Sequence, residues 1–251
     1  MIQSTRADQQ DADAFAHSRA YLRIRNIVRR HGAFLIPSWR AIKRAIWWCR
    51  YRSNKTKFQA IYTKNTWACV ESRSGEGSSL EATKRTREAL MDFVDRHKIR
   101  VILDVPCGDF NWMQKVSFLG RYIGGDIVRE LIYENEKKYA NDNRVFRLID
   151  LTCDPLPSCD LILSRDCLNH LSFEDIQKAL KNIWKCNAQF VAATNFPFVK
   201  KNHNQESGFT YRALNLSLPP FCLPEPFADY DEEHDAGKHL AFWRVQDLRC
   251  P

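Results

Sequence analysis

The segment Val101–Trp112 constrains the fold of this chain more than any other stretch of its 251 residues. A run of β-branched and aliphatic residues ends in an acid, Asp104, and then enters a turn that contains Pro106 and Gly108. A second strand-like run ends in Asp126, 22 residues after Asp104. Strand, glycine turn, helix, strand and acid form the pattern of a nucleoside-binding α/β unit, in which the second acid is placed to accept two ribose hydroxyls. We therefore expect a parallel sheet that binds a nucleoside at the carboxyl ends of its strands.

The rest of the chain keeps alternating between strand-like and helix-like patterns, as βαβ units do. Strands are expected at residues 100–105, 121–125, 144–149, 159–164, 189–194 and 238–245. Helices are expected from the capping box Ser78–Glu81 to about His97, and near residues 111–117, 128–140 and 173–185. Ser172 supplies the cap of the last helix, with acids in its first turn. The connections then follow the right-handed crossover rule, and the Pro-rich stretch 197–227 interrupts the alternation.

Composition places the chain among soluble globular proteins, with 44% hydrophobic and 27% charged residues. No run approaches the roughly 18 uncharged apolar residues of a membrane span. The net charge of +8 resides in residues 1–70, which hold 14 Lys and Arg against three Asp, whereas residues 71–251 hold 24 against 27 acidic residues. The nine cysteines show no Cys-x-x-Cys pair, which favours free thiols in a reducing, cytoplasmic compartment and argues against a metal site.

Residues 1–70 are expected to form a basic extension of a main domain at residues 71–251. A polar leader, residues 1–13, lacks the pattern of a secretory signal. Two amphipathic helices are expected at residues 14–31 and 38–52. Their apolar sides either pack on the domain as a lid or make peripheral contact with an anionic membrane. An RNA-binding arm is a third alternative, for which there is charge but no recognised module.

Several stretches resemble the motifs of class I S-adenosylmethionine-dependent methyltransferases, and the resemblance covers about residues 71–249. They are Leu103–Trp112, Tyr122–Ile127, Leu148–Thr152 and Asp160–Leu171, and Leu214–Phe221 resembles a bacterial-type subgroup of that family. The resemblance implies a Rossmann-like α/β three-layer sandwich with a seven-stranded, mostly parallel sheet whose last strand is antiparallel. It also implies S-adenosyl-L-methionine as cofactor. The Gly-x-Gly-x-x-Gly pattern of dehydrogenases is absent, which argues against a nicotinamide cofactor.

The same resemblance implies a set of cofactor-binding residues. In chain order they are Asp104, Pro106, Cys107, Gly108, Trp112, Asp126, Ile127, Asp150, Leu151, Ser164 and Arg165. Asp104 and Gly108 fall under the methionine part, Asp126 falls at the ribose, and Asp150 falls at the adenine amino group. Pro106 departs from the family, which has Gly there, so one backbone donor is lost and the turn is stiffer. From the residues alone, Asp104 could also be an acid that caps the following helix.

Asp166 and His170 follow the fourth predicted strand and are the candidate catalytic residues. Reactive groups of open α/β sheets cluster at the carboxyl ends of strands, and a histidine can deprotonate a hydroxyl or amine near neutral pH. The alternative is a histidine that bonds to nearby backbone. Arg165, Arg212 and Lys238 either hold an anionic substrate or are ordinary surface charges. The histidines at 203, 234 and 239 are expected in exposed or lid segments, and the polar loop 71–79 is either a lid or a linker.

The expected function is methyl transfer from S-adenosyl-L-methionine to an unidentified acceptor. Motifs such as Asn-Pro-Pro-Tyr, which mark base-methylating enzymes, are absent after the fourth strand, where Ser164–Cys167 stands instead. A small-molecule, lipid- or glycan-linked hydroxyl is therefore favoured as acceptor over a nucleic acid. Two alternatives remain open, an RNA methyltransferase and a non-catalytic scaffold that keeps the fold and binds partners through its basic helices.

Overall fold

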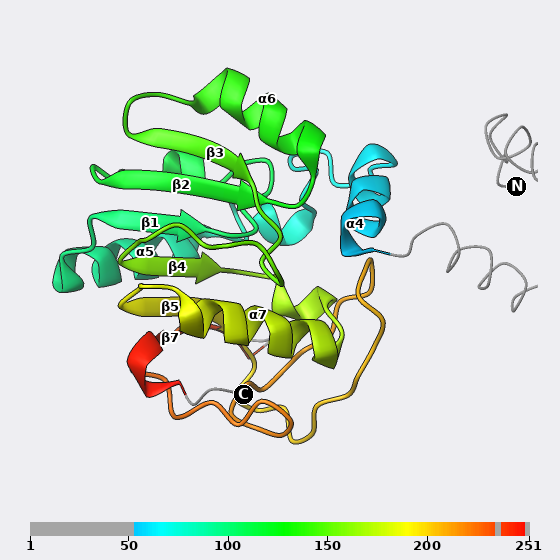
Figure 1. Ribbon diagram of the computed structural model, residues 1–251, viewed down its shortest axis with the longest axis vertical. Helices are drawn as coiled ribbons and strands as arrows, with labels where there is room; N and C mark the ends of the chain where they lie inside the picture. Colours follow the sequence, from blue (N-terminus) through cyan, green and yellow to red (C-terminus); the bar gives the residue numbers. More distant parts are fainter. Residues whose placement is uncertain (1–52, 234–236, 249–251) are drawn as a thin grey trace, which may run out of the picture. The chain divides into compact units, whose positions relative to one another are not determined.

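The computed structural model describes residues 53–233 and 237–248. Seven strands form one sheet in the order β3-β2-β1-β4-β5-β7-β6 (Figure 1). Neighbouring strands from β3 to β5 are parallel, whereas β7 runs antiparallel to both β5 and β6. The Rossmann-like α/β fold expected from the sequence, with an antiparallel last strand, is confirmed.

The strands are β1 (Val101–Asp104), β2 (Arg121–Asp126), β3 (Arg144–Leu148), β4 (Leu161–Ser164), β5 (Phe190–Asn195), β6 (Ala228–Glu233) and β7 (Lys238–Arg244). The helices are α4 (Asn54–Thr63), α5 (Lys84–His97), α6 (Arg129–Tyr139) and α7 (Phe173–Lys185). Short 3₁₀ turns lie at η2 (Glu76–Ser78), η3 (Met113–Lys115), η4 (Leu168–His170) and η5 (Val245–Asp247).

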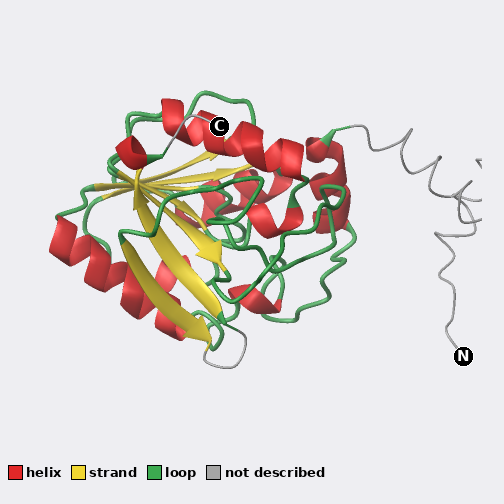
Figure 2. Ribbon diagram, turned by 90° about the horizontal axis from the view of Figure 1, so that it is seen from below, coloured by secondary structure: helices red, strands yellow, loops and turns green. Residues whose placement is uncertain are grey.

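Helices cover both faces of the twisted sheet (Figure 2). Side chains of α5 and α6 join one apolar core with strand residues such as Ile102, Leu161 and Phe242. The ring of Phe93 in α5 stacks on Phe242 at 4.0 Å between centroids. Side chains of α7 join the core on the other face. The sheet is therefore buried on both sides, as parallel sheets are.

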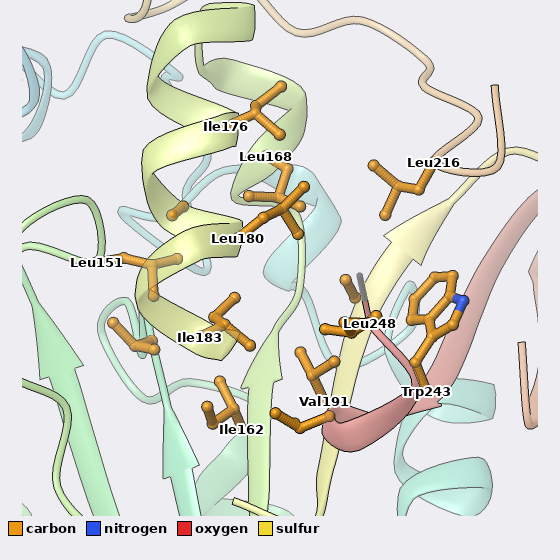
Figure 3. Close-up of a cluster of buried hydrophobic side chains, with 14 of the residues drawn as sticks. Leu151, Ile162, Leu168, Ile176, Leu180, Ile183, Val191, Leu216, Trp243 and Leu248 are labelled. Atoms are coloured by element: carbon orange, nitrogen blue, oxygen red, sulfur yellow. The ribbon is translucent and has the colours of Figure 1, made fainter. Parts of the chain in front are cut away.

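Helix α7 shows how the sequence builds one of these layers. The Ser172 hydroxyl accepts a hydrogen bond from the Asp175 amide and caps the helix, as expected from the sequence. Its buried residues Ile176, Ala179, Leu180 and Ile183 recur at helical spacing. Figure 3 shows Leu180 and Ile183 among strand residues such as Ile162 and Val191 in this core. Burying one such aliphatic side chain contributes about 1.5–3 kcal/mol, so this face fixes α7 on the sheet.

Three elements differ from the sequence expectation. The Ser79 hydroxyl accepts from the Ala82 amide, but it caps a separate turn, and α5 begins only at Lys84. The helix expected near 111–117 is reduced to the single 3₁₀ turn η3. Strand β6 was not expected, because its sequence, Ala-Asp-Tyr-Asp-Glu-Glu, is acidic; charged residues are nevertheless common on edge strands such as this one.

The compact unit that holds the described residues starts at Ser53. Residues 53–70 lie within this unit, whereas the sequence predicts a basic extension at residues 1–70. The helices expected at 14–31 and 38–52 lie outside the described residues. Within the described ranges, no helix is long and apolar enough to cross a membrane.

Strands β1 and β4 are neighbours in the sheet, although β2 and β3 lie between them in the chain. The chain thus changes direction across the sheet at this point. In open α/β sheets, ligands bind outside the carboxyl ends of the strands at such a switch point. Asp104 ends β1 and Ser164 ends β4, so the sequence motifs meet there.

Candidate active site

A cavity of about 600 Å³ lies at the carboxyl ends of β1, β2 and β4. Its floor is formed by the residues that follow these strands. Phe58 and Tyr62 of α4 and the loop 73–78 also line it, and α4 lies beyond the strand ends (Figure 1). The volume is in the range of pockets that hold a ligand of nucleoside size.

Asp104 is buried at the end of β1, where its carboxylate accepts a hydrogen bond from the Tyr122 hydroxyl at 2.7 Å. Burial raises the pKa of Asp104 to about 7, and the nearby Asp126 adds to the increase. A buried carboxylate without a bonded cation is costly in the free protein. A cation or hydrogen-bond donors that enter the cavity would stabilise the ionised form of this carboxylate.

Asp126 is buried at the end of β2, and both of its carboxylate oxygens face backbone donors. One oxygen accepts from the Gly108 amide at 3.2 Å and the other from the Val128 amide at 3.0 Å. Burial raises the pKa of Asp126 to about 6, although these amide contacts oppose the increase. Each carboxylate oxygen has two acceptor sites, so both can still accept a ligand hydroxyl.

Gly108 lies where the turn after β1 approaches Ser74 of the loop that lines the cavity. Its φ of +54° is in the left-handed region, and a Cβ there would collide with the Ser74 side chain. Only glycine adopts this φ without strain and has no Cβ to collide with Ser74. The Gly108 carbonyl accepts from the Asn135 amide group at 2.8 Å, which ties the turn to α6.

Asp150 follows β3 and lines the cavity beside Leu151. Its Oδ1 accepts from the Thr152 amide at 2.9 Å and from the Thr152 hydroxyl at 2.6 Å. This contact closes a turn that holds the aspartate in place. The side chain is therefore oriented by its own turn before any ligand binds.

A four-membered charge network follows β4. Arg165 contacts the Asp166 carboxylate at 2.9 Å and Glu232 at 2.7 Å. Lys238 contacts Asp166 at 2.8 Å and Glu232 at 3.6 Å. The two cations and two anions compensate one another, which is how buried charges are tolerated.

Asp166 is held in its ionised form by this network. Burial alone would raise its pKa, but Arg165 and Lys238 outweigh burial and hold the pKa well below its usual range. The Tyr211 hydroxyl also donates to it at 3.0 Å. A carboxylate stabilised in this way is a poor proton acceptor at neutral pH, so its geometry suits positioning rather than base catalysis.

One nitrogen of the Arg165 guanidinium, Nη2, makes no hydrogen bond to the described residues. Nε bonds Glu232 and Nη1 bonds the Gly77 carbonyl at 2.8 Å, whereas the buried Nη2 has no hydrogen-bond partner among the described residues. Because Arg165 lines the cavity and leaving a buried donor unpaired is costly, it is suited to a ligand carboxylate.

His170 lines the same cavity in η4. Burial lowers its pKa from the ordinary value, against the charge of Asp166 and backbone hydrogen bonds with residues 208–210. Its Nδ1 has no hydrogen-bond partner among the described residues. A lowered pKa favours the neutral imidazole, the form that can accept a proton.

The loop 71–78 is fastened above the cavity by Asp109. The Asp109 carboxylate accepts from the Ser72 hydroxyl at 2.9 Å, the Arg73 amide at 2.8 Å and the Ser74 hydroxyl at 3.3 Å. In return, the Asp109 amide donates to the Ser74 hydroxyl at 3.0 Å. The sequence leaves two alternatives open for this loop, a lid or a linker. The loop lines the cavity, which favours the lid.

Of the thirteen candidate residues named from the sequence, Ser164 alone does not line the cavity; it is buried in β4. The lining includes Asp104, Pro106, Cys107, Gly108, Trp112, Asp126, Ile127, Asp150, Leu151, Arg165, Asp166 and His170. Lys238 lines it as well, whereas Arg212 bonds backbone carbonyls of Asn169 and Leu171. His203 is exposed.

Five lining residues that carry aromatic rings were not predicted from the sequence. They are Phe58, Tyr62, Trp67, Phe196 and Tyr211. They belong to segments without a motif, so no local signal marks them. Glu232, which completes the charge network from β6, was not predicted either. Among the described residues, no group of three or more His, Cys, Asp or Glu side chains could hold a metal ion.

The comparisons with known proteins agree with this geometry. A family model described as a methyltransferase domain matches residues 103–188. No curated protein sequence matches the chain.

Solved structures similar to the chain include methyltransferases. The N-methyltransferase NodS from Bradyrhizobium japonicum, in complex with S-adenosyl-L-homocysteine, has a TM-score of 0.56 and 11% identity over 75% of this chain and 98% of NodS. Human N-acetylserotonin methyltransferase, in complex with S-adenosylmethionine, has a TM-score of 0.46 and 14% identity over 83% of this chain. The chain spans only 60% of that human enzyme. Residues 103–188 therefore match the methyltransferase domain family, and the chain has the fold of class I S-adenosylmethionine-dependent methyltransferases.

Proposed function

We propose that the protein transfers a methyl group from S-adenosyl-L-methionine to the hydroxyl of a small-molecule, lipid- or glycan-linked acceptor. The observation that carries this proposal is one cavity that joins two buried carboxylates, at the ends of β1 and β2, to His170 after β4. The two carboxylates suit a cationic nucleoside, and the histidine suits the removal of a proton from an acceptor.

The residues of the cavity fit this cofactor. Asp126 would hold the ribose hydroxyls, because its carboxylate keeps free acceptor sites. Asp104 would face the positively charged methionine part, which favours its ionised form. Arg165 Nη2, buried and without a partner among the described residues, would hold the methionine carboxylate. The cofactor, when bound, supplies a methyl carbon on a positively charged sulfur.

The protein's own contribution is placement, exclusion of water and removal of a proton. The cavity would hold the acceptor beside the bound cofactor, and holding two reactants together removes much of the entropic barrier. The roof of α4 and loop 71–78 excludes water. His170 takes the hydroxyl proton as the acceptor oxygen forms its bond to carbon, and the electron pair of the broken carbon–sulfur bond stays on sulfur.

Incorporation of a labelled methyl group tests this proposal. Full-length protein and radiolabelled S-adenosyl-L-methionine are incubated with small-molecule, lipid and glycan fractions. We expect His170→Asn to lower incorporation by about 100-fold or more, because a general base contributes about that much. His203→Asn, an exposed control, leaves the rate unchanged. A His170→Asn variant with the wild-type rate would remove His170 from the chemistry.

The proposal leaves two partner questions to experiment. Peripheral membrane contact through residues 14–52 stays a prediction, as does a cytoplasmic location. A nucleic-acid acceptor is less favoured, because the residues after β4 form a charge-neutral network rather than a basic patch. The scaffold alternative predicts a folded protein that does not bind the cofactor.

A further inference from the structure

Four rings form a continuous row along the cavity. Trp67 lies 5.4 Å from His170, His170 lies 5.2 Å from Tyr211, and Tyr211 lies 6.3 Å from Phe196, measured between ring centroids. All four line the cavity. The interplanar angles of 53°, 69° and 74° show that the rings are tilted rather than stacked on one another. The candidate base is thus one member of an aromatic wall.

The rings of the row differ in exposure, and the most exposed ring, Tyr211, lies between His170 and the buried Phe196. Phe196 is buried, His170 and Trp67 are half-buried, and Tyr211 is 42% exposed. The segment after α4, the η4 turn and the segment after β5 each supply part of it. Rings in such a position offer apolar faces and edges to a flat ligand that enters from outside.

No unpaired charge faces this row from the end of β4. Arg165, Lys238, Asp166 and Glu232 compensate one another, and the Tyr211 hydroxyl is used by Asp166. The vacant Arg165 donor is assigned to the cofactor. A charged acceptor beside the row would therefore lose its hydration without gaining a counter-ion from this network. An uncharged acceptor avoids this cost.

The basicity of His170 limits which hydroxyl it can deprotonate. Burial lowers the pKa of His170 below its ordinary value, so it is a weak base. A phenol, with a pKa of about 10 as in tyrosine, is within reach of such a base. An aliphatic hydroxyl resembles water, whose pKa is about 15.7, and its proton is much harder to remove.

We propose that the row of Trp67, His170, Tyr211 and Phe196 is the acceptor site and that it binds an uncharged aromatic compound with a phenolic hydroxyl. The inference rests on the proposed function and narrows its acceptor. The phenolic oxygen forms the new bond to the methyl carbon, and the carbon–sulfur bond breaks with its electron pair on sulfur. The phenolic proton passes to His170 and then to water. The products are an aryl methyl ether, S-adenosyl-L-homocysteine and one proton.

Binding of a matched pair of alcohols tests the proposal. Full-length protein is first saturated with S-adenosyl-L-homocysteine, and a naphthol and its saturated counterpart, decahydronaphthol, are then titrated by ligand-observed NMR. We expect the naphthol to bind about tenfold more tightly, because ring contacts add to apolar burial. Mass spectrometry with S-adenosyl-L-methionine is expected to show methoxynaphthalene and no ether of the saturated alcohol.

Variants place the binding on the row. Trp67→Leu is expected to remove the preference for the naphthol and Trp67→Phe to retain most of it. Trp184→Leu, a partly exposed control on α7 that does not line the cavity, leaves it unchanged. Equal binding of the two alcohols, or a preference that Trp67→Leu leaves intact, would overturn the inference while the proposed function stands. Failure to bind S-adenosyl-L-homocysteine would overturn both.

Discussion

Asp104 is a carboxylate that the fold buries at a cost to its own stability. Its folded-state pKa of about 7 lies above the value of about 3.9 in an unfolded chain. The folded protein therefore holds this proton more tightly than the unfolded chain, and stability decreases as pH rises from about 4 to about 7. Asp126 acts in the same direction, with a pKa of about 6.

Asp104→Asn is expected to stabilise the free protein at pH 8, because asparagine carries no charge to bury. The gain is up to about 4 kcal/mol, the equivalent of three pH units, and it disappears near pH 4. The same change weakens cofactor binding, because the carboxylate is lost. Denaturant unfolding at pH 4 and pH 8 measures the effect, with the exposed Asp95→Asn as control. A less stable Asp104→Asn protein at pH 8 would contradict this account of the site.

At the scale of elements, the loop 71–78 depends on contacts that few residues supply. Asp109 accepts three hydrogen bonds from it, and Arg165 bonds the Gly77 carbonyl. The Asn111 side chain also donates to the Glu71 carboxylate at 2.7 Å and to the Ser78 carbonyl at 3.0 Å. The loop can therefore be released without disturbing the sheet.

Asp109→Ala is expected to release the loop and to raise the dissociation rate of S-adenosyl-L-homocysteine by up to about 100-fold, since three hydrogen bonds of about 1 kcal/mol each are lost. Stopped-flow displacement measures this rate. Asp142→Ala, at an exposed position away from the main cavity, serves as control. A dissociation rate unchanged by Asp109→Ala would show that the loop does not retain the ligand.

The elements and the part of the cavity at the strand ends could be predicted because their signals are local. Asp104, Gly108 and Asp126 fall within strand–turn–helix patterns whose spacing fixes where they meet. The aromatic part of the cavity could not, because Trp67, Phe196 and Tyr211 come from segments without regular structure and meet only in the folded chain. Strand β6 was not predicted, because its sequence is acidic. One of its acids, Glu232, is buried only because Arg165 and Lys238, from other parts of the chain, pair with it in the folded protein.

At the scale of the whole molecule, the structure moves the boundary of the domain to Ser53. The Ser53 hydroxyl caps α4, accepting from the Thr56 amide at 3.3 Å, and Asn54 bonds Asp175 of α7 at 2.9 Å. At its other end α4 is held by Tyr62, which donates to Glu134 of α6 at 3.0 Å. A boundary at residue 71 would remove this roof from the cavity.

Two truncations test the boundary. Residues 53–251 are expected to fold and to bind S-adenosyl-L-homocysteine within about threefold of the full chain, whereas residues 71–251 lose about tenfold or more, since they lack the apolar contacts of Phe58, Tyr62 and Trp67. Thermal melting checks that each fragment is folded. Equal affinity of the two fragments would show that α4 is no part of the site.

The same 53–251 fragment separates the interpretations of the N-terminal residues. If residues 14–52 contact an anionic membrane, the full chain floats with anionic vesicles and the fragment does not. Equal flotation of the full chain with neutral and anionic vesicles would contradict an electrostatic contact.

The central claim is that the two acids at the strand ends bind the cofactor, and calorimetric titration of S-adenosyl-L-homocysteine tests it most directly. Saturable binding is expected for the wild-type chain. Asp126→Asn is expected to lower the affinity by about 100-fold, because charged hydrogen bonds to the ribose hydroxyls are lost, and Asp95→Asn is expected to leave it unchanged. No binding to the folded wild-type protein, or equal affinities for all three proteins, would contradict the claim.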